Sequence, residues 1–436
     1  MRCRAVTDRL AALISLGCSK NLADSEDLVT ALRSTGFALT KELGAADLVL
    51  VNTCSFIEGA KQESIDHILS AAEGRKDGAK LFVAGCLTER YLGDLAKEFP
   101  EVDQWVVFKD YDRFPAVLRK HFRDLPQHRL RHDQRSQLTP PHFAYLKIAE
   151  GCDNTCNFCA IPLFRGKHKS RPQEQLVAQA KVYAERGVRE INLISQHLDY
   201  WGQDLYGERR LPELVRAVAA AAPDAWIRLH YCYPNDFSDE LITAMAETPN
   251  VVRYVDMPIQ HASDRTLAVM GRRTTRARIE ERLAAIRTAM PDVVLRSTFI
   301  VGFPGERDDD FAELLDFIGK QKLDAAGCFT YSDEDGTTAF KMPDKIPAEV
   351  ALERQRRFMT KQQRIHRDRA KRWVGRELEV LVDSQRDFET FTTRHYGQAH
   401  EVDGATLVSA QALTIGSRVR VRVTGRTGYD LVAETV

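Results

Sequence analysis

The sequence HFAYLKIAEGCDNTCNFC, residues 142–159, joins an apolar run to three closely spaced cysteines. The run at residues 145–149 is typical of a buried strand, and Cys152, Cys156 and Cys159 follow it in the pattern Cys-x-x-x-Cys-x-x-Cys. Three thiolates on one loop can bind three irons of a cubane iron–sulfur cluster. The fourth iron would then stay open to an exogenous molecule, as in a catalytic metal site.

Two other interpretations of this loop are weaker. A structural zinc site needs four ligands, usually from a repeated Cys-x-x-Cys pair, and the sequence contains no second pair. Free cysteines are often buried as small apolar side chains, but this loop also carries Asp153, Asn154 and Asn157. We therefore expect an iron–sulfur cluster with an open iron.

Strand-like runs alternate with helix-length segments through the middle of the chain. This alternation predicts a parallel α/β barrel, or a partial barrel, of six βα-type units. Active sites of such barrels lie on the loops that follow the strands, so the cysteine loop is expected at the barrel mouth. The predicted strands span residues 145–149, 190–194, 226–230, 253–257, 294–300 and 325–330.

The first hundred residues predict a second parallel α/β sheet. Cys18, Cys54 and Cys86 each come shortly after one of its strands, so they would emerge at the same carboxyl edge. A single cysteine is more often a small buried side chain, but three at equivalent positions, two of them after Gly17 and Gly85, favour a second cluster with an open iron. The predicted strands span residues 10–16, 47–51 and 81–84, and the helices 24–34 and 56–73.

The rest of the chain divides by composition. The polar and basic residues 109–141 are expected to form a linker. Residues 349–372 predict one long helix, in which nine Lys or Arg stand against two acidic residues from position 353 onward. After Gly375 the apolar period becomes two, which indicates a small all-β module. We expect an α/β protein with domains at 1–127, 138–370 and 373–436.

Composition and charge give no sign of a nucleic-acid-binding, membrane or disulfide-rich protein. The 62 Lys and Arg balance 62 Asp and Glu, so overall charge does not point to a nucleic-acid or membrane partner. The apolar run at residues 10–16 is too short to span a membrane. We expect a cytoplasmic protein without a membrane partner, in which the odd count of nine cysteines favours metal binding or catalysis over a disulfide framework.

The motif GCDNTCNFC resembles the signature of radical S-adenosylmethionine (SAM) enzymes, with Phe158 as the aromatic residue before the last cysteine. Together with the dispersed cysteines, the barrel and the β tail, it is similar to the methylthiotransferases. These join a cluster-binding N-terminal domain, a radical SAM barrel and a TRAM domain.

The chain resembles the RimO-type branch of that family, which modifies an aspartate of ribosomal protein S-12. The alternative is the MiaB-type branch, which modifies isopentenyladenosine in tRNA. Ser19 and His400 depart from the RimO-type pattern, where proline is usual. The segments that carry the resemblance are SLGCSKNLADSE, HFAYLKIAEGC, CAIPLFRGKHKSRP, ISQHLDYWG, RLHYCYP, DMPIQHAS, RSTFIVGFPGE and EVDG.

The resemblance implies SAM and two [4Fe–4S] clusters with different tasks. The cluster on Cys152, Cys156 and Cys159, the catalytic cysteines, would cleave SAM to a 5′-deoxyadenosyl radical that takes hydrogen from the aspartate β-carbon. The cluster on Cys18, Cys54 and Cys86 would supply sulfur, and a second SAM would supply the methyl group.

Residues at strand ends are the candidates for contact with SAM. The resemblance places Phe158 beside the adenine, Ser195 and Gln196 near the methionine amine, and Gln260 and Arg296 near the ribose or carboxylate.

An alternating basic strip follows the cysteine loop. It would steer an acidic substrate loop or close over the site, or else form a solvated strand edge. It consists of Arg165, Lys167, Lys169 and Arg171.

The implied partners are ribosomal protein S-12, free or in the small subunit, and an electron donor such as flavodoxin or ferredoxin. Ribosomal RNA is a further expected contact, through the TRAM domain and the basic helix. Two other classes stay open: a nucleic-acid-binding protein with structural clusters, and an iron–sulfur carrier.

Overall fold

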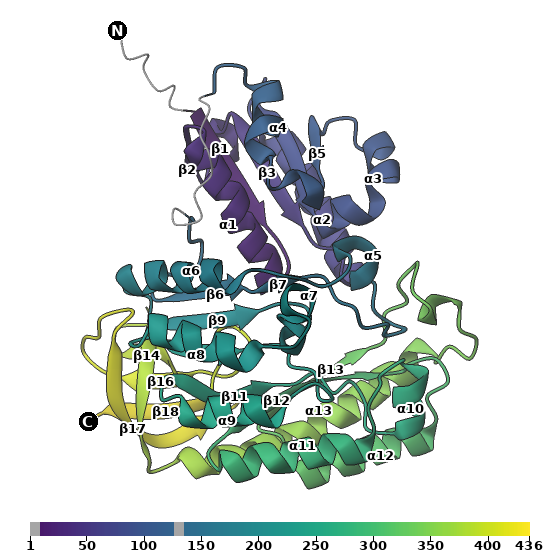
Figure 1. The fold of residues 1–436 in the computed structure, drawn as a ribbon, viewed down its shortest axis with the longest axis vertical. Coiled ribbons are helices and arrows are strands. Elements are labelled where there is room, and N and C mark those ends of the chain that lie inside the picture. Colours follow the sequence, from purple (N-terminus) through teal and green to yellow (C-terminus); the bar gives the residue numbers. More distant parts are fainter. Residues whose placement is uncertain (1–8, 126–134) are drawn as a thin grey trace. The chain divides into compact units, whose positions relative to one another are not determined.

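The computed structural model describes residues 9–125 and 135–436, which divide into two compact units (Figure 1). Unit 1 takes the described residues up to Thr139 together with Ala160–Lys167. Unit 2 takes Pro140–Cys159 and His168–Val436. The chain therefore leaves unit 2 directly after Cys159 and returns to it at His168.

Unit 1 is built on a parallel sheet whose five described strands lie in the order β2-β1-β3-β4-β5. The predicted N-terminal α/β sheet is confirmed, but β2 and β5 were missed because they have only four and three residues. The strands are β1 Arg9–Ser15, β2 Phe37–Thr40, β3 Leu48–Thr53, β4 Lys80–Gly85 and β5 Gln104–Val106. The helices are α1 Ser19–Ser34, α2 Glu58–Gly74, α3 Cys86–Glu98, α4 Phe114–His121 and α5 Ile161–Arg165, with 3-10 turns η1 Leu43–Ala45 and η2 Phe108–Asp110.

The central strand β3 faces two hydrophobic cores. Leu48 and Leu50 pack with residues of α1 and α4, whereas Val49 and Val51 pack with residues of α2 and α3. Every residue of β3 is buried, as expected for a parallel strand covered on both faces, and this explains its uninterrupted apolar run. The carboxyl ends of the strands remain as a common edge for loops.

Unit 2 contains a parallel sheet of six described strands in the order β13-β12-β11-β10-β9-β6. The six predicted βα-type units and the partial-barrel alternative are confirmed, since β6 and β13 end the sheet without pairing to each other. The strands are β6 Phe143–Lys147, β9 Glu190–Ile194, β10 Trp226–Leu229, β11 Val251–Asp256, β12 Val294–Val301 and β13 Ala325–Thr330. A separate antiparallel pair is formed by β7 Ala149–Glu150 and β8 Lys169–Ser170.

Helices follow these strands and bury one large core against the sheet (Figure 1). The predicted long basic helix is α13 Ala348–Ala370, whose Phe358 is fully buried in that core. The other helices are α6 Gln173–Glu185, α7 Gln203–Tyr206, α8 Leu211–Ala221, α9 Asp239–Glu247, α10 Asp264–Val269, α11 Arg276–Ala289 and α12 Asp308–Gln321. The 3-10 turns are η4 Leu198–Tyr200, η5 Ala339–Lys341 and η6 Lys371–Trp373.

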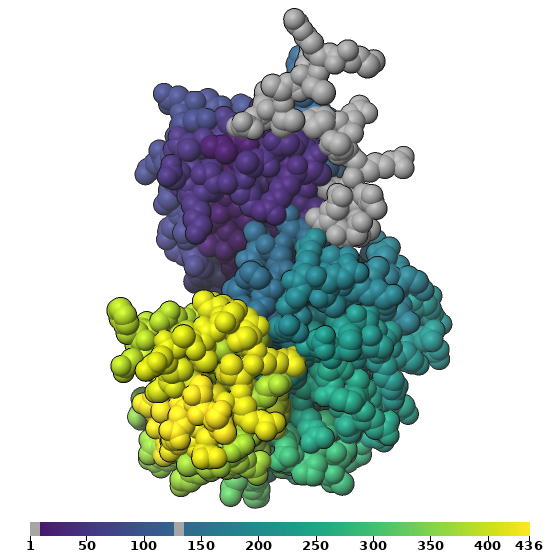
Figure 2. Space-filling view, turned by 90° about the vertical axis from the view of Figure 1, so that its left-hand side faces the viewer, coloured from purple at the N-terminus to yellow at the C-terminus, as the bar shows by residue number. Residues whose placement is uncertain are grey.

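The tail of unit 2 is a closed barrel in the order β14-β15-β16-β18-β17, as the period-two pattern predicted. It packs against three strands of the six-stranded sheet: Trp226 and Val294, which begin β10 and β12, and Tyr254 of β11 share a core with barrel residues such as Val380 and Val421. Figure 2 shows the tail, in yellow, lying directly against teal and green residues of the same unit. Its strands are β14 Glu377–Gln385, β15 Thr390–His395, β16 Thr406–Ser409, β17 Arg418–Thr427 and β18 Asp430–Thr435.

Two details of the sequence prediction were wrong. The expected linker at residues 109–141 contains α4, whose Phe114 and Leu118 are buried in the core of unit 1. Helix α1 begins at Ser19 and not at the predicted Asp24. The prediction missed the first turn because that turn is polar and carries no apolar period. The expected domain end at residue 127, and the linker residues 126–134, lie outside the described residues.

In residues 9–125 and 135–436, the helices are all too short or too polar to cross a membrane.

Candidate metal centres

Cys18, Cys54 and Cys86 lie at the carboxyl edge of the unit 1 sheet. Cys18 caps the start of α1 beyond β1, Cys54 follows β3 directly, and Cys86 begins α3 directly after β4. Because β1, β3 and β4 are neighbours in a parallel sheet, the loops after them share one edge. The structure therefore brings together three cysteines that lie more than thirty residues apart along the chain.

Two glycines allow these loops to approach one another. Gly17 has φ +86°, and a Cβ there would lie 2.9 Å from the Sγ of Cys54. Gly85 has φ +96°, and a Cβ there would lie 2.3 Å from the carbonyl oxygen of Thr53. Only glycine adopts such φ values without strain, so both positions are shaped for close packing around the cysteines.

Buried amides tie the same loops together. Asn21 donates from Nδ2 to the carbonyl oxygens of Leu16 (2.6 Å) and Thr53 (3.1 Å). Asn52 donates from Nδ2 to the carbonyl oxygen of Asn21 (2.9 Å) and to Ser25 Oγ (2.7 Å). Such a network fixes the positions of the cysteine backbones before any ligand binds.

Arg165 is the residue whose place the sequence analysis misjudged. It was expected in an exposed basic strip, but its side chain is only 3% exposed and its Nη2 donates to the Sγ of Cys86 at 3.2 Å. Arg171, from the same strip, donates to the carbonyl oxygen of Lys147 within unit 2. The prediction that these basic residues form one continuous exposed strip is therefore wrong.

The thiols of unit 1 differ in their tendency to ionise. Burial raises the pKa of Cys86 to about 12 and also raises that of Cys54, although the charge of Arg165 lowers both. Desolvation opposes ionisation of Cys18 as well, but the charges of Lys20 and Arg165 outweigh it and lower its pKa. Each thiol must lose its proton to bind iron, so Arg165 favours metal binding at all three.

Cys152, Cys156 and Cys159 lie in unit 2, on the loop that follows β7. Cys159 is the last residue of unit 2 before the chain enters unit 1. The loop is held through Asn157, which donates from its backbone nitrogen to Met270 (2.9 Å) and from Nδ2 to Val269 (2.8 Å). All three cysteines are partly exposed, as a site with an open iron requires.

Positively charged side chains lie beside two of these sulfurs. Arg272 places Nη1 3.7 Å from the Sγ of Cys156, and its guanidinium stacks 4.0 Å from the ring centroid of Tyr233. Burial opposes protonation of His197, but hydrogen bonds to Asp236 and Cys152 outweigh it and raise its pKa to about 9. Sequence reasoning missed both residues, since neither has a diagnostic spacing from the cysteines.

Both cysteine sets fit a cubane cluster in their donor chemistry. Each set offers three thiolates, which is the ligand type that iron–sulfur clusters use. Within residues 9–125 and 135–436, no group of three or more His, Cys, Asp or Glu side chains converges on a single metal ion. A cubane spreads its thiolates over separate irons, so it does not require such convergence.

Four of the five SAM candidates lie on loops or strand ends of unit 2. Phe158 packs beside Phe303 with ring centroids 6.4 Å apart. Ser195 and Gln196 follow β9; Ser195 Oγ accepts a hydrogen bond from the backbone of His197. Gln260 has φ +74° and bridges to β12 at Phe299.

Gln196 has an incomplete set of hydrogen bonds. Its Nε2 donates to Glu150 Oε1 at 2.6 Å, whereas its buried Oε1 accepts no hydrogen bond from the described residues. A buried polar atom without a partner costs free energy, so this oxygen is suited to receive a donor from a ligand.

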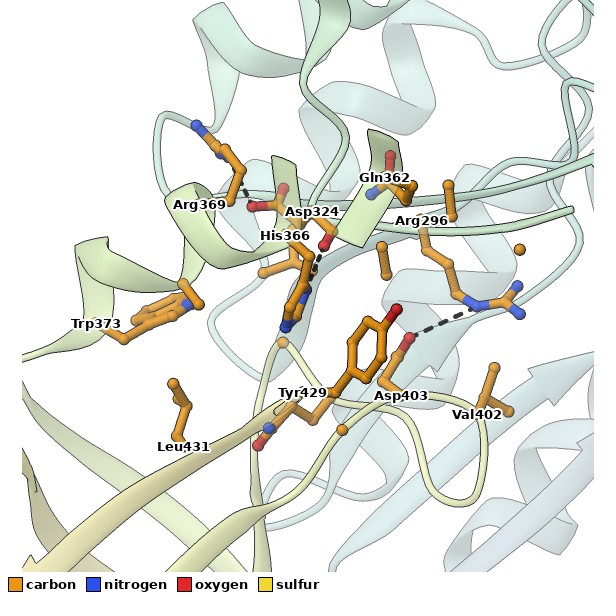
Figure 3. A pocket seen from close by; sticks show the side chains of 18 of the residues that line it. Arg296, Asp324, Gln362, His366, Arg369, Trp373, Val402, Asp403, Tyr429 and Leu431 are labelled. Atoms are coloured by element: carbon orange, nitrogen blue, oxygen red, sulfur yellow. Dashed lines mark hydrogen bonds and ion pairs between the residues drawn. The ribbon is translucent and has the colours of Figure 1, made fainter. Parts of the chain in front are cut away.

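Arg296, the fifth candidate, lies in a cavity of about 410 Å³ between β12, β13, α13 and the tail barrel (Figure 3). Its guanidinium is already held by two carboxylates, Asp256 (2.7 Å) and Asp403 of the tail (3.6 Å). Tyr254 donates to the second oxygen of Asp403 at 2.7 Å. Among the described residues that line this cavity, none is another SAM candidate or a cysteine.

Three family models match successive parts of the chain. Residues 146–318 match the radical SAM superfamily, residues 11–107 match an uncharacterized protein family, UPF0004, and residues 374–436 match the TRAM domain.

Curated relatives match over nearly the whole length. The chain is 44% identical to a ribosomal protein uS12 methylthiotransferase RimO of Symbiobacterium thermophilum, covering 97% of this chain and 90% of that protein. Proteins of the same name from Desulforamulus reducens and Myxococcus xanthus are each 42% identical and cover 97% and 99% of this chain, and 98% and 92% of their own lengths.

Solved structures share the fold at low identity. The radical SAM methyltransferase TsrM from Kitasatospora setae, solved with cobalamin and a [4Fe–4S] cluster, has a TM-score of 0.57 at 15% identity, covering 74% of this chain and 75% of that one. The cobalamin-dependent SAM radical enzyme OxsB, solved with aqua-cobalamin and SAM, has a TM-score of 0.53 at 13% identity, covering 82% and 56%.

Proposed function

Because the chain belongs to the ribosomal protein uS12 methylthiotransferase family, we propose that it adds a methylthio group to the β-carbon of an aspartate in uS12. The observation that carries the proposal is the pairing of two three-cysteine sets in one chain, one at the carboxyl edge of the unit 1 sheet and one on a loop of unit 2. Replacing an unactivated C–H bond by C–S needs both a radical source and a sulfur source, and each set can hold one of them.

We assign a [4Fe–4S] cluster to each set of cysteines. When bound, the cluster on Cys152, Cys156 and Cys159 would supply the electron that cleaves SAM, the cluster on the unit 1 cysteines would supply sulfur, and a second SAM would supply the methyl group. The residues of unit 2 position SAM and exclude water: Phe158 offers an apolar face, and Gln196 Oε1 is an open acceptor for the methionine amine.

Ser195, directly after β9, and Gln260, on the loop after β11, complete this proposed SAM site. Arg296 has a different part in it, because Asp256 and Asp403 already hold its guanidinium. We assign Arg296 the task of orienting Asp256, the last residue of β11, toward the ribose or carboxylate side of the site.

The proposed partners follow from this chemistry. The protein substrate is uS12, free or in the small subunit, so the reaction takes place in the cytoplasm, where ribosomes assemble. The TRAM barrel and the exposed arginines of α13, among them Arg364 and Arg367, are suited to contact ribosomal RNA. A flavodoxin- or ferredoxin-type protein is the proposed electron donor.

Mass spectrometry after an anaerobic reaction tests the proposal. The iron-reconstituted chain is given SAM and a reductant, with uS12 and tRNA offered side by side. A methylthio gain on an aspartate-containing peptide of uS12 is the expected result. A gain on isopentenyladenosine would favour the MiaB-type alternative, and 5′-deoxyadenosine without either product would contradict both substrates.

A further inference from the structure

Arg165 is a buried cation at the carboxyl edge of the unit 1 sheet, where three cysteines lie. Its Nη1 lies 2.9 Å from the Oδ2 of Asp24, and its Nη2 lies 3.2 Å from the Sγ of Cys86. The same Nη2 donates to Asn21 Oδ1 at 3.4 Å. One guanidinium therefore joins a carboxylate, an amide and a thiol within the same unit.

The position of this guanidinium is fixed by packing. Its central carbon lies 4.5 Å from the ring centroid of Phe108, and the preceding residue, Phe164, is buried beside Cys86 and Ala160. A planar guanidinium can stack on a ring and donate from its edge at the same time, which the ammonium of lysine cannot do. The contact to Cys86 thus depends on arginine and not only on positive charge.

Charge explains why a cation is needed here. The side chain of Asp24 is only 2% exposed, and three thiolates bound to iron would add further negative charge on the same edge. Uncompensated charges are costly to bury, so a carboxylate beside thiolates destabilises them unless a cation lies between. Arg165 occupies that position.

We propose that Arg165 is a positioning residue for the sulfur-supplying centre, which holds Cys86 in place and offsets the charge of Asp24 so that the three thiolates retain iron. The inference rests on the proposed function only in assigning a cluster to these cysteines. The inference assigns a role to Arg165, which was expected in an exposed basic strip.

The chain position of Arg165 adds a second consequence. It lies six residues after Cys159, on the segment Ala160–Lys167 that belongs to unit 1. The segment that directly follows the unit 2 cysteines therefore supplies the cation beside the unit 1 cysteines.

The test measures iron retention, which does not require methylthiolation activity. The parent is the full chain with Cys152, Cys156 and Cys159 all replaced by Ala, so that only the unit 1 set remains. After anaerobic reconstitution, iron and sulfide per chain are measured, followed by the rate of iron loss to a chelator. Arg165→Gln should weaken iron retention about tenfold or more, as the loss of a residue that holds a metal ligand in place does at metal sites.

Matched variants separate the contact from the charge. Arg113→Gln removes an arginine of unit 1 that is 62% exposed, and it should retain iron like the parent. Arg165→Lys keeps the charge but loses the stacked fork, so it should also lose iron faster than the parent. If Arg165→Gln does not fold, Arg165→Lys still decides the matter, because retention equal to the parent in that variant would overturn the proposed contact.

The double variant Asp24→Asn/Arg165→Gln tests whether Arg165 only neutralises Asp24. Restoration of parent iron retention in this variant would overturn a role at Cys86, and continued loss would support it. A parent that binds no iron would instead overturn the unit 1 cluster, and with it this inference. Equal retention in the parent and Arg165→Gln would overturn the role of Arg165 alone.

Discussion

Arg394 of the tail barrel places Nη1 2.5 Å from the Oε2 of Glu190, the first residue of β9, and both side chains are buried. Arg228 of β10 holds the other oxygen of Glu190 at 2.6 Å, and Asp383 of β14 holds Arg394 at 2.8 Å. This chain of ion pairs crosses from the sheet to the barrel inside unit 2. It makes the tail part of the same folded body.

Glu190→Gln should therefore destabilise unit 2. Breaking a buried ion pair leaves charge uncompensated, here that of Arg228, while Arg394 keeps only Asp383, and it costs about 3 kcal/mol or more. Urea denaturation followed by tryptophan fluorescence measures the free energy of unfolding. Glu208→Gln is the control, because that carboxylate is 71% exposed and 3.8 Å from its partner, and it should leave the free energy unchanged. Equal effects of the two substitutions would contradict the importance of the buried pair.

The same carboxylate predicts a dependence of stability on pH. Burial opposes ionisation of Glu190, but Arg394 and Arg228 outweigh it and lower its pKa from 4.5 to about 2. A folded-state pKa below the unfolded value means that the stabilisation is present above about pH 4.5 and is lost as pH falls toward 2. The loss amounts to about 3 kcal/mol over that range, since one unit corresponds to about 1.4 kcal/mol.

Measuring the urea midpoint from pH 5 to pH 2.5 tests this dependence. The wild-type chain should lose stability more steeply than Glu190→Gln, because the variant has no proton to take up at this position. Other carboxylates titrate in both chains and cancel in the comparison. Parallel curves would show that Glu190 is not held ionised by the arginines.

Gly85→Ala should disturb the cysteine edge of unit 1. The backbone at Gly85 has φ +96° and ψ −166°, and an added Cβ would meet the backbone of Thr53 at 2.3 Å. Such a conformation costs a non-glycine residue about 1–3 kcal/mol before the steric clash is counted. Thermal unfolding should show a lower midpoint, and iron bound by the unit 1 cysteines should fall with it.

Gly93→Ala is the matched control for that substitution. Gly93 lies in α3, the helix that begins directly after Gly85, and an added Cβ there meets nothing within 4 Å. Alanine favours helix over glycine, so this variant should be as stable as the wild type or more so. An equal loss of stability in Gly93→Ala would mean that α3 tolerates no such substitution. The close approach of Gly85 to Thr53 of β3 would then not explain the effect of Gly85→Ala.

The sequence predicted the sheets better than the contacts around the cysteines. Long buried strands such as β3 and β12 leave an apolar signal, whereas β5 is three residues long and leaves almost none. The spacing of Cys152, Cys156 and Cys159 is local, so it was readable directly.

The place of Arg165 was not predictable in the same way. Its partners Asp24 and Cys86 lie 141 and 79 residues away along the chain, and only the folded sheet brings them together. The alternation of basic residues after the cysteine loop suggested an exposed strand edge, but α5 turns Arg165 into the core of unit 1. Burial of a charged side chain depends on such distant partners, which a local pattern does not contain.

The two cysteine sets should be separable by single substitutions. Cys156→Ala removes a thiolate from the loop assigned to SAM cleavage, so 5′-deoxyadenosine should fall to background and no methylthio product should form. Cys54→Ala leaves that loop intact, so SAM cleavage should persist while the methylthio product on uS12 is lost. Cys328→Ala is the control, because this buried cysteine lies in β13 outside both sets, and it should retain both products. Chromatography of 5′-deoxyadenosine and mass spectrometry of uS12, taken from the same anaerobic reaction, give the two readouts. Loss of SAM cleavage in Cys54→Ala would mean that the unit 1 cysteines are needed for the radical step, and the division of labour between the two sets would have to be abandoned.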